Sequence, residues 1–180
     1  MRYVVMIGIA LFAALITGGV SPQIPILGAE PDIVLVAMLA MELREKTATP
    51  IIVFSVAAVF IDAFYAPALG YYSCPYAVVG LIVFAIFAKK RINRFYGPAA
   101  ICAAAWFVKD ILSAILSFFL GNSFDFFHIF VNSTLPGMLV NAVLIFPVYL
   151  LFDMLYRHSF MTPRSAGIKD EFPGLIRKQR

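Results

Sequence analysis

Apolar runs alternate with short polar segments along the whole chain. Roughly 20 residues are needed for a helix to cross a bilayer. Two of the runs are shorter, so we extend the second back through Ile24, Ile26 and Leu27 as irregular backbone and begin the fourth at Tyr72. The pattern predicts an all-α polytopic membrane protein with six transmembrane helices. The predicted spans are residues 3–20, 24–43, 50–69, 72–88, 98–120 and 136–155.

Composition supports the membrane assignment. Hydrophobic residues make up 62% of the chain and charged residues 13%, whereas soluble domains have roughly 45–50% and about 25%. We therefore expect a single transmembrane domain over residues 1–180, ending in a basic cytoplasmic tail at 156–180. The net charge of +4 comes from basic residues between apolar runs, which argues against nucleic-acid binding.

The basic residues predict the topology. Of the 14 Lys and Arg residues, 13 lie in alternate connections and at both termini, as the positive-inside rule requires of cytoplasmic segments. Both termini are therefore predicted to be cytoplasmic. The alternative for the first span is a cleaved signal peptide, but its length and the charge alternation favour a retained helix. A solvated turn is expected at Glu42, Arg44, Glu45 and Lys46.

Lys109 is the exception among the basic residues, because it lies within the fifth span beside Asp110. Counted from the cytoplasmic starts of their spans, Asp62 is about 18 Å up and Lys109 about 17 Å up. We therefore predict that Asp62 pairs with Lys109 inside the bundle. Asp110 is rotated by about 100° and either shares the pair or faces another helix. The alternative is that each charge finds separate water, tyrosine or backbone partners.

Other polar residues have structural interpretations. Asp32, after Pro31, is predicted to cap the start of the second span. Asn141 is predicted to form an interhelical hydrogen bond. His128 and His158 fall on opposite sides of the predicted membrane, so they cannot share a metal or a catalytic triad. We expect no enzymatic activity, no metal and no cofactor.

The connection at residues 121–135 is aromatic and nearly uncharged. Such a segment suits the outer membrane interface, or a surface offered to a partner. The candidate residues for this outer partner surface are Phe124, Phe126, Phe127 and His128.

Three stretches carry a family resemblance: GGVSPQIPILGAEPDIVLVAMLAMELREK, FIDAFYAPALG and NAVLIFPVYLLFDMLYR. The first looks like the region between the first and second spans of the bacterial rod-shape-determining family MreD, which leads into a Pro-Asp pair. The second resembles that family's third span, where an Asp precedes a turn-forming Leu-Gly ending. Ala66 stands where the family often has glycine.

The resemblance implies a non-enzymatic scaffold subunit of the cell-elongation machinery in the bacterial cytoplasmic membrane. It implies MreC as the direct partner. It also implies MreB and the glycosyltransferase and transpeptidase of lateral peptidoglycan synthesis as members of the same assembly.

A second function remains open, because MreD-like proteins also resemble the six-helix substrate-binding subunits of energy-coupling-factor vitamin transporters. In that case Ala10 and Ala14 would contact the transporter's membrane subunit. Outer aromatic residues such as Phe124, Phe126, Phe127 and Tyr71 would then line a ligand pocket. Such a pocket needs convergent polar groups in an outward-facing cavity.

Overall fold

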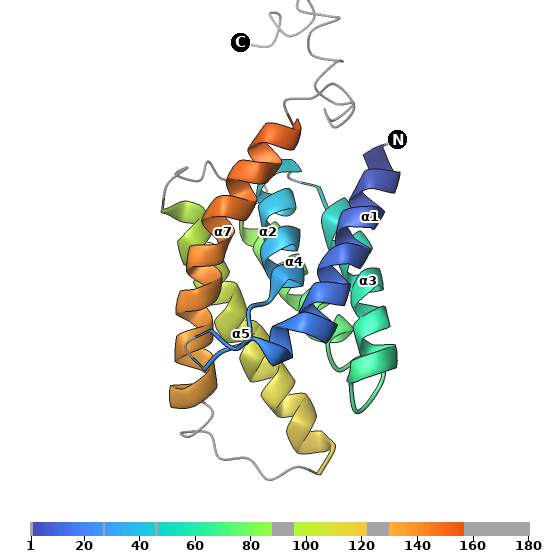
Figure 1. Ribbon diagram of the computed structural model, residues 1–180, viewed down its shortest axis with the longest axis vertical. Coiled ribbons are helices and arrows are strands. Elements are labelled where there is room, and N and C mark those ends of the chain that lie inside the picture. The colour runs from blue at the N-terminus through green and yellow to red at the C-terminus, as the bar shows by residue number, and fades with distance from the viewer. Residues whose placement is uncertain (1, 27, 46, 88–95, 122–129, 157–180) are drawn as a thin grey trace, which may run out of the picture.

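The computed structural model describes residues 2–26, 28–45, 47–87, 96–121 and 130–156. These residues form a bundle of helices (Figure 1) and contain no β-strand beyond an isolated bridge between Ile26 and Ala29. The α-helices are α1 (Arg2–Leu15), α2 (Ile33–Glu45), α3 (Thr49–Tyr65), α4 (Ser73–Phe87), α5 (Gly97–Phe119) and α7 (Leu135–Tyr156). Three short helical turns complete them: η1 (Ile16–Val20), η2 (Ser21–Gln23) and η3 (Phe130–Thr134).

The all-helical prediction is confirmed, and every predicted span overlaps one of these α-helices. Within the described ranges, three helical segments are long and apolar enough to cross a membrane, namely Arg2–Gln23, Gly97–Phe119 and Leu135–Tyr156. Two shorter apolar helices are Thr49–Tyr65 and Ser73–Phe87. These segments support a membrane protein, and the count of six spans stays a prediction.

Helix α2 forms the centre of the bundle. It contacts each of the other five α-helices in the described part of the chain, and Figure 1 shows it between α1 and α7. Every residue from Val34 to Glu42 is buried. A helix that is apolar on all sides is one that other helices surround, which explains why α2 is the core element.

The chain before α2 is irregular, as predicted. Residues 24–26 and 28–32 contain no helix, and Ile24 and Ile26 are exposed. Leu27 lies outside the described residues. Helix α2 therefore has only 13 residues, about 20 Å of helix, and its first residue lies well inside the bundle.

Polar contacts among Arg2, Glu45 and Tyr156 join three helix ends. We call this the terminal end of the bundle. Nη2 of Arg2 lies 2.6 Å from Oε2 of Glu45, and the Tyr156 hydroxyl donates to Oε1 of Glu45. The start of α1 and the ends of α2 and α7 thus share one end. The expectation of a solvated turn is wrong for Glu42 and Glu45, which are 3% and 8% exposed, because α1 and α7 cover this end of α2.

Helices α5 and α7 pack closely through a glycine. A Cβ built on Gly137 of α7 would lie 2.4 Å from both Cε2 and Nε1 of Trp106 in α5. The indole is 5% exposed and rigid, so it has little room to move aside. Gly137 is therefore a position where only glycine fits without a shift of the two helices.

Replacing Gly137 with alanine is expected to lower the free energy of unfolding by about 1–3 kcal/mol, the usual cost of overpacking. Reversible denaturation of the purified protein in detergent would measure it. Gly8→Ala is the matched control, because nothing lies within 4 Å of a Cβ at Gly8. Because alanine favours the helix over glycine, Gly8→Ala should be at least as stable as the wild type. Equal stability of Gly8→Ala and Gly137→Ala would contradict the packing argument.

Candidate functional site

A buried ion pair joins the start of α2 to the middle of α5. Nζ of Lys109 lies 2.7 Å from Oδ2 of Asp32, and the two side chains are 9% and 2% exposed. The Tyr76 hydroxyl donates to the same Oδ2 at 2.8 Å. The backbone N–H of Leu35 donates to Oδ1 at 2.9 Å, which confirms the predicted helix cap at Asp32.

Aromatic rings cover Lys109 on other sides. Its Nζ lies 4.2 Å from the centre of the Trp106 ring and 5.3 Å from that of Tyr76. Both distances lie within the range of cation–π attraction. The ammonium charge is therefore shared between one carboxylate and two ring faces.

Asn141 extends this network to α7. Its Oδ1 accepts a hydrogen bond of 2.9 Å from the backbone N–H of Asp32. Its Nδ2 donates to the carbonyl of Gly137, also at 2.9 Å. Asn141 is completely buried, and the predicted interhelical hydrogen bond is confirmed. We call Asp32, Tyr76, Lys109 and Asn141 the central polar cluster.

The predicted pair between Asp62 and Lys109 is wrong. Asp62 lies in the last turn of α3, and its carboxylate holds the connection to α4. Oδ2 accepts from the backbone N–H groups of Gly70 and Ser73 at 3.0 and 3.1 Å and from the Ser73 hydroxyl at 2.5 Å. Oδ1 accepts from the N–H of Tyr72 at 2.6 Å. The carboxylate of Asp62, which the sequence predicted to pair with Lys109, is therefore satisfied by donors in the α3–α4 connection.

Asp110 lies outside the central cluster. The Thr134 hydroxyl donates to its Oδ2, which ties α5 to η3. The sequence left open whether Asp110 shares a pair with Lys109 or faces another helix. The structure shows that it faces another element, η3. The predicted outer surface at Phe124, Phe126, Phe127 and His128 lies outside the described residues.

A polar cavity of about 470 Å³ opens beside the central polar cluster. It lies where α1 ends and α2 begins, at the opposite end of α1 from Arg2. We call it the polar cavity. Residues that line it are Thr17, Gly18, Gly19, Ser21, Pro22, Gln23, Glu30, Pro31, Asp32, Ile61, Tyr65, Tyr72, Tyr76, Trp106 and Lys109.

The turn η1, a π-helical segment, forms part of this wall, and such turns are frequent at functional sites. Gly18 lets the ring of Tyr65 approach, because a Cβ there would lie 2.7 Å from Cδ2 of Tyr65. Sequence reasoning missed Tyr65, Tyr76 and Trp106 as wall residues. For Tyr76, which is completely buried, the available signal was that a buried tyrosine usually needs a polar partner for its O–H.

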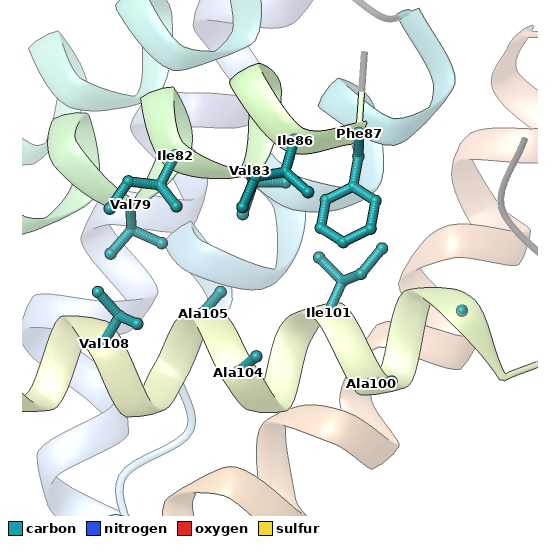
Figure 2. Close-up of a pocket in the computed structure, with 11 residues that line it drawn as sticks. Val79, Ile82, Val83, Ile86, Phe87, Ala100, Ile101, Ala104, Ala105 and Val108 are labelled. Atoms are coloured by element: carbon teal, nitrogen blue, oxygen red, sulfur yellow. The ribbon is translucent and has the colours of Figure 1, made fainter. Parts of the chain in front are cut away.

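A second hollow, of about 460 Å³, lies between α4 and α5 (Figure 2). Its walls are entirely apolar and include Val79, Val83, Ile101 and Ala105. Figure 2 shows these side chains approaching one another across the two helices. This crevice offers no polar group that could orient a reacting molecule.

Among the described residues, no group of three or more His, Cys, Asp or Glu side chains is placed to hold a metal ion. The central polar cluster can fix helix ends and shape the polar cavity, and its acid and base neutralise each other. Comparison of the chain with protein-family models, curated proteins and solved structures finds no match.

Proposed function

We propose that this protein is a non-enzymatic scaffold subunit of the bacterial cell-elongation machinery, the role of the MreD family that its sequence resembles. In this proposal it spans the cytoplasmic membrane six times with both termini in the cytoplasm. It acts through contacts with MreC. MreB and the enzymes of lateral peptidoglycan synthesis belong to the same assembly.

The observation that carries the proposal is the set of contacts made by Asp32 and Asp62, the two aspartates in the stretches that carry the resemblance. Asp32, of the Pro-Asp pair, caps α2 and binds Lys109 and Tyr76. Asp62 holds the backbone around Gly70, of the Leu-Gly ending. Both carboxylates are fully engaged in fixing helix ends, which suits a scaffold that presents a defined shape to its partners.

The outer faces of the helices support a function based on helix contacts. Large apolar side chains are exposed along several helices, where they can meet lipid or a partner helix. Examples are Val4 and Phe12 of α1, Ile52 and Phe64 of α3, and Leu139 and Val143 of α7. Polar groups inside and apolar groups outside are the arrangement expected of a bundle in lipid.

Depletion of the protein in its host tests the proposal. We expect rod-shaped cells to become round as the protein is lost, and the wild-type gene supplied in trans to restore rods. The Gly8→Ala variant should restore them equally well, because the substitution meets open space. An affinity-tagged copy should retain MreC after extraction in mild detergent. Normal cell shape after complete depletion would refute the scaffold function.

The polar cavity favours a second candidate, a substrate-binding subunit similar to those of energy-coupling-factor transporters. The cavity supplies the convergent polar groups that such a function requires. Tyr71, the suggested ligand-pocket residue that lies in the described part of the chain, is not among its wall residues. Depletion would then leave cell shape normal and create a requirement for an external nutrient. The same depletion experiment therefore separates the two candidates.

A further inference from the structure

The positive charges at the polar cavity are already neutralised by the protein. Lys109 is bound to Asp32 and covered by the rings of Trp106 and Tyr76. The positive end of the α2 dipole meets the carboxylate of Asp32 and the amide oxygen of Asn141. An anionic ligand would therefore find no uncompensated positive group in the described wall.

The negative charge at the cavity is not neutralised. Glu30 lines the cavity and is exposed, and its carboxylate has no hydrogen-bond or ion-pair partner in the described part of the chain. The carbonyl end of the α1–η1 helical segment also lies at this wall and adds partial negative charge. The cavity as a whole carries an excess of negative charge, located at Glu30.

Aromatic rings form much of the remaining wall. Tyr65, Tyr72, Tyr76 and Trp106 all line the cavity, and the face of an aromatic ring attracts a cation. Ser21 lines it too, is 2% exposed, and has a hydroxyl without a partner among the described residues. An unsatisfied buried hydroxyl is costly, and a bound molecule with a polar hydrogen would relieve that cost.

We propose that the polar cavity binds a small organic cation, with an ammonium group at Glu30 and its apolar body against the tyrosine rings. A volume of about 470 Å³ is typical of small-molecule sites. This inference goes beyond the scaffold function and does not rest on it.

Fluorescence of Trp106 provides the test, because it is the single tryptophan of the chain and lines the cavity. Phenyltrimethylammonium is the probe, added to the full chain in nanodiscs of zwitterionic lipid. We expect saturable quenching of the tryptophan emission. The neutral isostere tert-butylbenzene and the anion benzenesulfonate should give only the linear change of non-specific partition.

Glu30→Gln should weaken binding of the probe about tenfold, the effect of roughly 1.4 kcal/mol of charge attraction. Glu30 is exposed and has no partner among the described residues, so this variant should fold normally. Asp153→Asn is the matched control, since it changes the net charge equally and lies in α7 near the terminal end; it should leave the affinity unchanged. Absence of saturable quenching, equal saturable binding of the isostere, or equal affinities of wild type and Glu30→Gln would each overturn the proposal. None of these results bears on cell shape after depletion.

Discussion

Replacing Lys109 with methionine is expected to lower the free energy of unfolding by about 3–5 kcal/mol, because it leaves the carboxylate of Asp32 buried without its counter-ion. Asp32→Asn should cost a similar amount, since it leaves the ammonium of Lys109 unpaired at a side chain that is 9% exposed. Reversible denaturation in detergent micelles would measure both. Removal of one partner is costly because the charge that stays behind remains desolvated.

The double variant Asp32→Asn with Lys109→Met isolates the coupling. We expect it to be more stable than the sum of the single losses predicts, because no unpaired charge remains. Asp62→Asn combined with Lys109→Met is the control pair and should be additive, since Asp62 binds the α3–α4 connection instead. Additive effects at Asp32 and Lys109, together with coupled effects at Asp62 and Lys109, would contradict our assignment and favour the pairing that the sequence predicted.

Helix positions were predictable from sequence because apolar runs and their boundaries carry a direct physical signal. Helices α5 and α7 begin and end within one residue of the predicted 98–120 and 136–155. Pro98 stands at the start of α5, where its missing N–H costs nothing. Helix α3 ends at Tyr65, four residues earlier than expected, because Pro67 disfavours helical backbone at the residue before it, and Ala66 is extended.

The error over Lys109 has a specific cause. Depth along the spans matches Lys109 with Asp62, whereas the cap predicted at Asp32 gives that residue a separate role at the start of the second span. Counted from the terminal end, Asp32 lies 13 residues up α2, or about 20 Å, which is close to the depth of Lys109. The irregular backbone before α2 carries Asp32 inward, and apolar periodicity contains no signal for how deeply such a segment enters.

The polar cavity could not be assembled from sequence for a different reason. Its wall comes from η1 and η2, the segment before α2, the end of α3, the α3–α4 connection, α4 and α5. Each contributes residues that look unremarkable in isolation, such as Gly18 or Tyr65. Their convergence depends on which helices are neighbours and how each is rotated, and neither follows from a single hydrophobic pattern.

Replacing Asp62 with alanine is expected to lower the free energy of unfolding by about 3 kcal/mol. The carboxylate accepts hydrogen bonds from three backbone N–H groups and one hydroxyl, and bonds to a charged acceptor are worth more than neutral ones. Gly70 has a φ of +95°, a conformation that glycine adopts readily, and its N–H donates to Asp62. Denaturation in detergent would give the stability of the variant.

Asp110→Ala is the matched control for Asp62→Ala. Among the described residues its carboxylate accepts one hydrogen bond, from the Thr134 hydroxyl, and its loss should cost about 1 kcal/mol. Ser73→Ala should also be mild, since the backbone bonds to Asp62 remain. Amide hydrogen exchange would locate the effect: faster exchange at Gly70, Tyr72 and Ser73 is expected in Asp62→Ala and not in Asp110→Ala. Equal stability losses for the two aspartate variants, with unchanged exchange at the α3–α4 connection, would show that Asp62 does not hold that turn.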